Sequence, residues 1–328
     1  EAIGTITQLE SVQWVGSAEN TNWSESANWA GGAIPDESNV GTIIIGNSYD
    51  TVYDADSFGS TSSSITNNGS IMHLLNSQNR FISLEGSMNF RDFGGYATAD
   101  GLVAKGKLFR CGSLANIPER AHAVFAALDI GVICDLRRDD EIEHGPTPTT
   151  EPFRVRVHIP IAPGSSPQLM SSFQDSNQTH LDRISFMREI TREIARDHVD
   201  AYRKLFAELM AVENGFLLHC SAGKDRTGFG AAMIQLALGV SMKDVVTDYL
   251  LTNSAEELFE YLLPRFLERY GEDADEKSLR VIAGVREEYL TAALQEVLDG
   301  YGSYEGYLDT AGLDNYARKE LRSRLIVK

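Results

Sequence analysis

The chain is short of positive charge, and its first 79 residues contain no lysine or arginine. Overall it carries 29 basic and 47 acidic residues, a formal net charge of −18 at pH 7. Such an acidic molecule is not suited to bind nucleic acid or anionic lipid through its overall charge. An anionic substrate would therefore need a local cluster of basic groups.

Cysteine is also scarce, with three in 328 residues, and these do not make a disulfide framework. Cys134 lies in an apolar run typical of a buried strand, whereas Cys111 fits either a core or a surface position. No apolar run approaches the roughly 18 to 20 residues that span a bilayer, so no transmembrane segment is predicted. The chain begins at Glu1 rather than at methionine. We expect a secreted or periplasmic location, with a cytoplasmic one as the alternative.

The composition changes near residue 80, and this length suits about two domains. Residues 1–79 are rich in Asn, Ser, Thr and Gly, and their short apolar runs predict a small β-rich module. The tryptophans of this module fill its core or line a glycan-binding face: Trp14, Trp23 and Trp29. Residues 80–328 form the second predicted domain. Within it, residues 181–210 show a long amphipathic helical pattern whose arginines fit either a phosphate-steering stripe or salt-bridged solvated faces.

One stretch of the second domain joins a strand pattern to a helix pattern through a tight loop. Phe216 to Leu218 form a short apolar run, and apolar residues recur at helical spacing from Thr227 until Gly239. Between them, Cys220 and Arg226 are separated by five residues. Backbone N–H groups in such a loop, together with the helix dipole, form an anion site of phosphate size.

The residue types in this loop favour covalent phosphate chemistry. Arg226 can offer a two-pronged donor to phosphate oxygens. The positive field favours the thiolate form of Cys220, which could attack phosphorus and form a cysteinyl-phosphate. Thr227 can assist with its hydroxyl group. The predicted phosphate-binding residues are Ser221, Ala222, Gly223, Lys224, Asp225, Arg226 and Thr227.

The run from His219 to Gly228, His-Cys-Ser-Ala-Gly-Lys-Asp-Arg-Thr-Gly, resembles the signature of the cysteine-dependent protein tyrosine phosphatases. Other blocks resemble a bacterial subfamily of tyrosine and lipid phosphatases; these blocks are residues 89–96, 106–114, 135–137 with Glu141, and 301–308. The resemblance covers roughly residues 80–328. It implies an α/β fold with a central mixed, largely parallel sheet flanked by helices. It also implies that residues 255–289 form a movable helical lid; the alternative is that these helices only bury one face of the sheet.

The resemblance implies a phosphomonoester hydrolase that needs no cofactor and no metal. Its expected substrates are phosphotyrosine proteins, with phosphoserine, phosphothreonine and phosphoinositides or inositol phosphates as further candidates, and its product is inorganic phosphate. Lys224 adds a cation to the loop, as in lipid phosphatases of the tensin type, which suits a polyanionic head group.

The general acid is less clearly marked than the nucleophile. The candidates, in order, are Asp225 in the loop, Asp135 at the end of a predicted strand, and Asp175. Asp225 could instead pin the loop. Arg91 and Asp92 form either a buried pair that holds the loop or an ordinary surface pair. The acidic run at 139–141 is typical of a solvated turn and helix start.

Two other functions are consistent with the same sequence. One is a phosphate-binding module that has lost catalysis, although Cys220 and Arg226 are both intact. The other is a secreted surface or glycan-binding protein in which residues 1–79 carry the biology.

Overall fold

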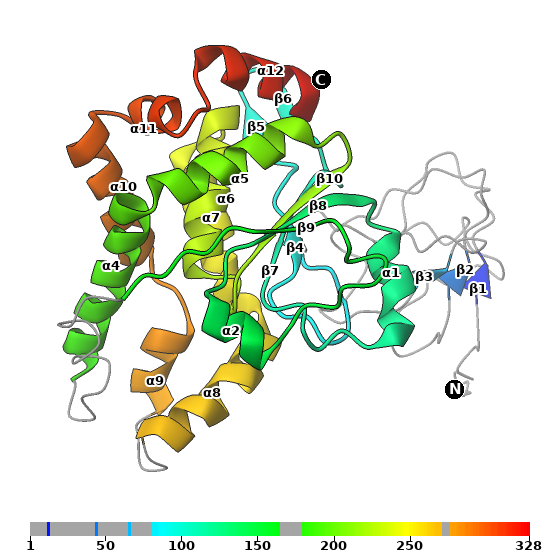
Figure 1. The fold of residues 1–328 in the computed structure, drawn as a ribbon, viewed down its shortest axis with the longest axis vertical. Helices are drawn as coiled ribbons and strands as arrows, with labels where there is room; N and C mark the ends of the chain where they lie inside the picture. Colours follow the sequence, from blue (N-terminus) through cyan, green and yellow to red (C-terminus); the bar gives the residue numbers. More distant parts are fainter. Residues whose placement is uncertain (1–11, 14–42, 45–64, 67–79, 165–178, 271–275) are drawn as a thin grey trace, which may run out of the picture. The chain divides into compact units, whose positions relative to one another are not determined.

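The computed structural model describes residues 12–13, 43–44, 65–66, 80–164, 179–270 and 276–328 (Figure 1). The chain divides into two compact units, Glu1–Arg80 and Phe81–Lys328. Three short strands of the first unit pair in parallel: β1 Val12–Gln13, β2 Ile43–Ile44 and β3 Ile65–Thr66. The three tryptophans of this unit lie outside the described residues.

The second unit is built on a five-stranded sheet with the order β4-β7-β10-β8-β9. Its strands are β4 Arg91–Asp92, β7 Leu108–Cys111, β8 Ile130–Asp135, β9 Arg156–His158 and β10 Gly215–His219. Every neighbouring pair is parallel except β4 and β7, which are antiparallel. The predicted α/β class, with a mixed, largely parallel sheet flanked by helices, is confirmed.

Strand β10 is the centre of this sheet, and all five of its residues are buried. Because side chains alternate along a strand, Phe216 and Leu218 face one core and Leu217 faces the other. A parallel strand buried on both faces is expected to be continuously apolar, which the run Phe216–Leu218 is.

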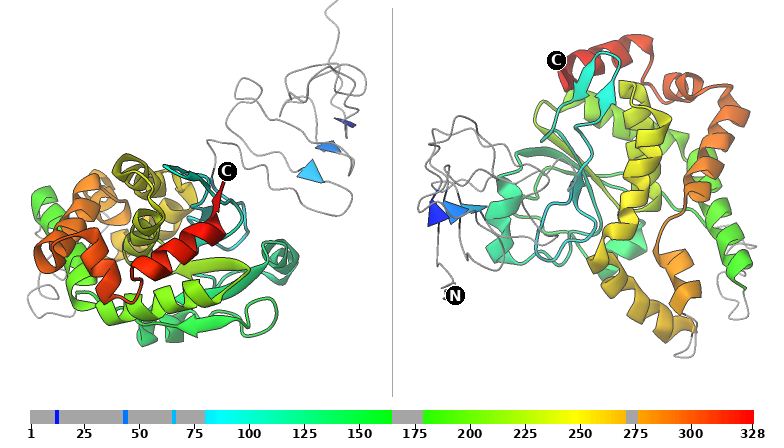
Figure 2. Two further views of the ribbon diagram at one scale, coloured as in Figure 1. Left: turned by 90° about the horizontal axis from the view of Figure 1, so that it is seen from above. Right: turned by 180° about the vertical axis from the view of Figure 1, so that it is seen from behind.

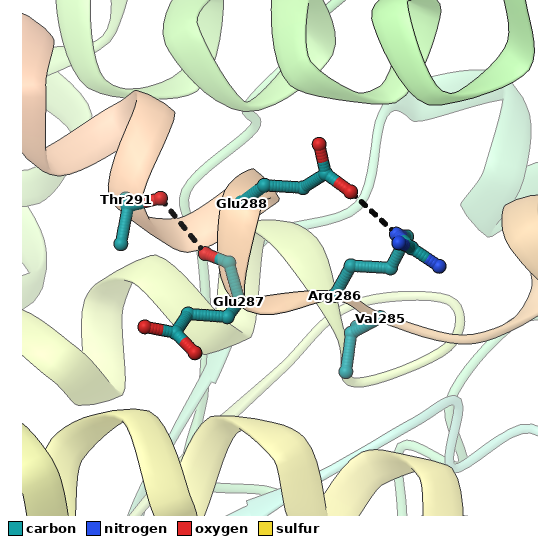
Figure 3. Close-up of a pocket in the computed structure, with 5 residues that line it drawn as sticks. All are labelled: Val285, Arg286, Glu287, Glu288 and Thr291. Atoms are coloured by element: carbon teal, nitrogen blue, oxygen red, sulfur yellow. Dashed lines mark hydrogen bonds and ion pairs between the residues drawn. The ribbon is translucent and has the colours of Figure 1, made fainter. Parts of the chain in front are cut away.

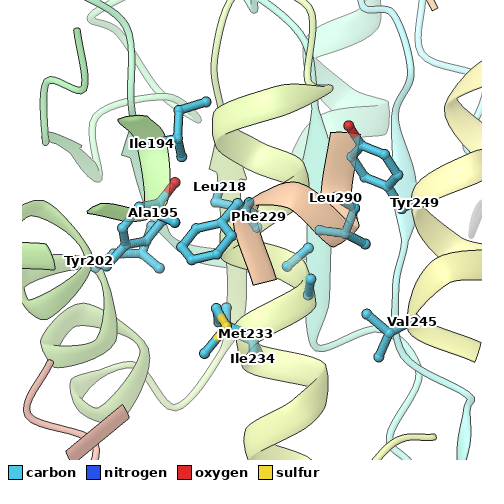
Figure 4. Close-up of a cluster of buried hydrophobic side chains, with 14 of the residues drawn as sticks. Ile194, Ala195, Tyr202, Leu218, Phe229, Met233, Ile234, Val245, Tyr249 and Leu290 are labelled. Carbon is cyan, nitrogen blue, oxygen red and sulfur yellow. The ribbon is translucent and has the colours of Figure 1, made fainter. Parts of the chain in front are cut away.

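The larger core lies under a layer of helices on one face of the sheet (Figures 1 and 4). These helices are α4 His180–Asp197, α5 Val199–Ala211, α6 Asp225–Leu238, α7 Met242–Leu250 and α10 Glu287–Tyr301. The smaller core, on the other face, includes Phe125 of α1 His122–Ala126, which follows the short 3-10 turn η2 Glu119–Ala121.

Helix α6 is central to the larger core, and 12 of its 14 residues are buried. A helix that is apolar on all sides is stable only when surrounded by protein. Phe229 of this helix packs edge-on against Tyr202 of α5, with 5.0 Å between ring centroids (Figure 4). The helix ends as predicted at Gly239, whose φ of 88° provides the left-handed C-terminal cap.

Three helices gather at one end of the unit: α2 Asp139–His144, α8 Glu256–Tyr270 and α9 Glu276–Ala283 (Figures 1 and 2). The 3-10 turn η3 Leu251–Ser254 leads into α8. The remaining elements are β5 Ala97–Thr98, β6 Gly101–Val103, α11 Tyr304–Thr310, α12 Asn315–Leu325 and β11 Ile326–Val327. Strand β6 pairs antiparallel with β5. Strand β11 pairs antiparallel with β6. No helix in the described part of the chain has both the length and the apolar character needed to cross a membrane.

Candidate active site

The predicted phosphate loop, residues 220–227 and called the phosphate loop from here on, connects the buried end of β10 to the start of α6. Cys220 follows directly after His219, the last residue of β10, and its side chain is almost fully buried with 2% exposure. Helix α6 begins at Asp225, so the N–H groups of its first turn lie within the loop. The loop therefore joins a fixed strand end to the positive end of a helix dipole, as the sequence predicts.

Gly223 allows the loop to lie directly on the neighbouring strand β7. Its φ is +66°, and a Cβ atom added there would lie 2.4 Å from the carbonyl carbon and oxygen of Cys111. A side chain is therefore excluded both by the left-handed backbone and by the backbone beneath it.

Arg226 is held by a carboxylate from α2. Its Nη1 and Nη2 donate to the two oxygens of Glu141 at 2.6 and 2.9 Å. Glu141 also accepts from the Ser221 hydroxyl at 2.5 Å. Among the described residues, none accepts a hydrogen bond from Arg226 Nε. A guanidinium held at one edge keeps this N–H available for an oxyanion.

The surroundings of Glu141 keep it ionised. Burial alone would raise its pKa, but the hydrogen bonds and charge of Arg226 lower the pKa of Glu141 to about 2. The helix start predicted at residues 139–141 is confirmed, since α2 begins at Asp139. The prediction that this run is solvated is wrong for Glu141, whose partner Arg226 lies 85 positions away. The one signal in the sequence was its place in the block of residues 135–141.

Asp135 occupies a structural position rather than a proton-donating one. It is fully buried at the end of β8 and accepts from Arg137 Nε and Nη2 at 2.9 and 2.8 Å. Burial favours its protonated form, but His219 and Arg137 outweigh this and hold the pKa of Asp135 well below its usual value. An acid that stays ionised cannot donate a proton at neutral pH, so this geometry does not fit Asp135 as the general acid.

Asp225 and Thr227 keep unpaired polar atoms at the loop. Within the described part of the chain, Asp225 Oδ1 and Thr227 Oγ1 have no hydrogen-bond partner. Buried polar atoms are normally paired, so these two atoms are suited to meet a ligand. Asp225 Oδ2 lies 3.4 Å from the Lys224 ammonium. Asp175 lies outside the described residues.

Lys224 points toward the predicted lid. Its Nζ donates to the backbone carbonyls of Ile282 in α9 and of Gly284 just beyond it, at 2.5 and 3.2 Å. The last carbonyls of a helix lack intrahelical partners and attract cations. In this conformation the Lys224 ammonium therefore binds the backbone of residues 282–284.

Arg91 and Asp92 are both buried, but Arg91 pairs with a different carboxylate. Arg91 Nε lies 3.5 Å from Asp248 Oδ1, whereas Asp92 accepts from the amides of Gly94 and Gly106 at 2.7 and 2.6 Å. The alternative of an ordinary surface pair does not hold. The sequence interpretation also missed Asp248, for which no local signal exists.

A cavity of about 530 Å³ lies beside the start of α10 (Figure 3). The residues that line it are distant in the sequence from the phosphate loop. The cavity's described lining is Val285, Arg286, Glu287, Glu288 and Thr291. Arg286 Nε pairs with Glu288 at 2.6 Å, so its one cation is already neutralised. None of these residues belongs to the phosphate loop. In the part of the chain that the structure describes, no group of three or more His, Cys, Asp or Glu side chains could hold a metal ion.

Comparison with known proteins identifies the family. The model of the tyrosine phosphatase family matches residues 82–327, which is about three quarters of the chain. The chain belongs to the tyrosine phosphatase family. The match begins close to the start of the second unit and includes the whole phosphate loop.

Named relatives agree with this membership. This phosphatase is 30% identical over 281 residues to the triple specificity protein phosphatase PtpB of Mycobacterium tuberculosis, covering 74% of this chain and 98% of that protein. It is 32% identical over 233 residues to a putative tyrosine-protein phosphatase of Cupriavidus necator, covering 68% and 81%. These relatives support the interpretation as a phosphatase and give no support to the surface or glycan-binding alternative.

Proposed function

We propose that this phosphatase hydrolyses phosphate monoesters through a cysteinyl-phosphate formed on Cys220. The Cys220 thiolate attacks phosphorus, the bond from phosphorus to the ester oxygen breaks, and Asp225 gives that oxygen its proton. A water then attacks phosphorus and gives a proton to Asp225. The sulfur–phosphorus bond breaks, which releases inorganic phosphate and restores the thiolate.

The observation that carries this proposal is the state of Arg226. Its guanidinium is held by Glu141 and by the backbone carbonyls of Leu136 and Ile161, and its hydrogen bonds within the described residues all run through Nη1 and Nη2. A donor that is already oriented needs no reorganisation when charge develops on the phosphoryl oxygens. The amides of Ser221 to Thr227 complete the anion site in this proposal.

Asp225 is the preferred general acid because of its position. It lies inside the loop, and its Oδ1 is buried without a partner in the described structure. Asp135, by contrast, is committed to Arg137. A role for Asp225 in pinning the loop remains the alternative, and the two roles differ in how activity depends on the leaving group.

Phosphotyrosine is the proposed primary substrate. The name of the Mycobacterium tuberculosis relative assigns that protein three specificities. By analogy we extend the proposal to phosphoserine, phosphothreonine and phosphoinositides. A polyanionic head group would give Lys224 a second partner besides the carbonyls of Ile282 and Gly284.

We also propose a secreted or periplasmic location.

Residues 255–289 are proposed to act as a lid. Support for the lid comes from the burial of Cys220 and from the contact of Lys224 with residues 282–284. Movement of such a lid would gate access to Cys220, and its closure would exclude water from the reaction.

The test is a phosphate-release panel with a chelator present, covering phosphopeptides, inositol lipids and soluble inositol phosphates. Cys220→Ser should reduce turnover of every substrate by at least about a thousandfold, because the hydroxyl is a far weaker nucleophile. It should still bind inorganic phosphate. Cys134→Ser, which changes a buried thiol of the core, is the matched control and should keep the activity of its folded fraction. Substantial turnover by Cys220→Ser would exclude the cysteinyl-phosphate.

A further inference from the structure

Four consecutive carbonyl groups of the phosphate loop, those of residues 221–224, accept hydrogen bonds from residues outside the loop. Ser221 O accepts from the backbone amide of Ser113 at 3.0 Å. The next three carbonyls accept hydrogen bonds from two side chains, those of Asn89, which lies just before β4, and of Arg110 in β7. The contacts are Asn89 Nδ2 to Ala222 O and Gly223 O at 3.2 and 2.9 Å, and Arg110 Nη2 to Gly223 O and Lys224 O at 2.9 and 3.4 Å.

Holding the carbonyls on one side determines where the amides point. In a tight loop, peptide carbonyls that turn outward leave the N–H groups converging on the concave side, which is what an oxyanion requires. Asn89 donates to two of the four carbonyls, and it shares that of Gly223 with Arg110. It thus acts on the anion site without touching the substrate.

The side-chain amide of Asn89 is itself fixed. Arg91 Nη1 donates to Asn89 Oδ1, so the NH₂ group of Asn89 must face the loop. The residue is 1% exposed, and its φ of +53° is left-handed, a conformation that non-glycine residues rarely adopt. Backbone strain of this kind persists where surrounding contacts impose it, often next to functional sites.

Behind Asn89 lies a buried network with an excess of positive charge. Asp248 of α7 accepts from Arg110 Nη1 at 2.9 Å and lies 3.5 Å from Arg91 Nε. Tyr96 OH donates to the same carboxylate at 3.3 Å. Burial and the neighbouring Arg110 lower the pKa of Arg91 to about 10, which still leaves it charged at neutral pH. One carboxylate thus faces two guanidinium groups behind the anion site.

We infer that Asn89 is a positioning residue for the phosphatase reaction, which turns the amides of the phosphate loop toward the phosphoryl oxygens. The inference rests on the proposed function, because it assumes that the loop binds the transferred phosphoryl group. Arg91 and Asp248 act one step further back by orienting Asn89 and Arg110.

Two substitutions test this role without altering the backbone preference. Asn89→Gly suits the left-handed φ but removes both donors, and Asn89→Asp keeps the shape and the contact with Arg91 but cannot donate. Both should lower kcat/KM for an aryl phosphate by about 10- to 100-fold and weaken inhibition by orthovanadate by a similar factor. The matched control is Asp129→Gly, at an exposed residue with φ +52°, which should change neither value.

The two variants distinguish a loss of folding from a loss of the positioning role of Asn89. If Asn89→Gly does not fold, Asn89→Asp carries the test, because Arg91 retains an acceptor there. A folded variant with kcat/KM and the orthovanadate inhibition constant within about twofold of the wild type would overturn the inference. Inactivity of the wild type itself, or activity of Cys220→Ser, would instead overturn the proposed function.

Discussion

At the residue scale, Glu141 is the carboxylate that pairs with Arg226, the arginine proposed to bind the phosphoryl group. Glu141→Gln keeps the shape but removes the charge that holds Arg226 at two points. We expect kcat/KM for an aryl phosphate to fall by about 10- to 100-fold, because Arg226 loses its fixed orientation. Steady-state kinetics measures the effect. Glu143→Gln, on the exposed side of the same helix, is the control and should be neutral. Equal activity of the two variants would mean that Arg226 is oriented by other groups.

Asp225 gives a second prediction at this scale. If it is the general acid, Asp225→Asn should slow hydrolysis of alkyl phosphates by about 100-fold or more and of nitrophenyl phosphate by less than about tenfold. The reason is that a poor leaving group needs the proton and a good one does not. Measuring kcat on both substrates decides the matter, with Asp139→Asn as a control at an exposed carboxylate. Equal losses on both substrates would assign Asp225 to pinning the loop.

At the element scale, Lys224 connects the phosphate loop to the end of α9. Lys224→Met keeps most of the stem but removes the donor to Ile282 O and Gly284 O. Amide hydrogen exchange in residues 279–285 should become about tenfold faster, because the final turn of α9 loses its cation. The rate on phosphoinositides should also fall more than the rate on phosphotyrosine.

The control for this prediction is Lys243→Met on the exposed surface of α7. If exchange is the same in both variants, Lys224 does not secure the lid in solution. If the two substrates are affected alike, Lys224 has no part in choosing between them.

Apolar periodicity and helix end signals predicted helices and strands correctly where the structure depends on nearby residues alone. The strand at 216–218 and the helix up to Gly239 both follow from periodicity and end signals. The helical pattern over 181–210, however, forms two helices, because the backbone leaves the helical region at His198. Of its arginines, Arg192 and Arg196 pair with Glu189 and Glu296, as expected for salt-bridged solvated faces.

The site was predictable only in part, for a physical reason. Cys220 and Arg226 lie in one short loop, so their spacing shows their relation. Glu141 and Asn89 reach that loop from elsewhere in the chain, and Asn89 contacts Gly223 across 134 positions. Asp248 acts at one remove, through Arg91 and Arg110. A contact between distant segments leaves no periodic trace in a single sequence.

At the scale of the whole molecule, the buried carboxylates make the second unit sensitive to acid. The folded pKa of Glu141 is about 2, below its ordinary value near 4.5, and that of Asp135 is lowered as well. The stability contributed by Glu141 is complete above about pH 4.5 and is lost as the pH falls toward 2. By linkage, the loss is on the order of 3 kcal/mol.

Urea unfolding followed by far-ultraviolet circular dichroism measures this loss, because all helices of the described residues lie in the second unit. The difference in unfolding free energy between the wild type and Glu141→Gln should shrink between about pH 5 and about pH 3. A difference that stays constant over this range would show that Glu141 titrates normally in the folded protein.

The close contact of Gly223 with the backbone of Cys111 also limits how this enzyme can be re-engineered. Residue 223 admits no side chain, and the Ser221 hydroxyl is already bound to Glu141. Ala222 is different, because it packs against the hydrophobic cluster of Met88, Ala255 and Leu258, the last of which lies in the first turn of α8. Mutant libraries that aim at new selectivity should therefore diversify Ala222 together with its neighbours on α8, and leave the glycine untouched.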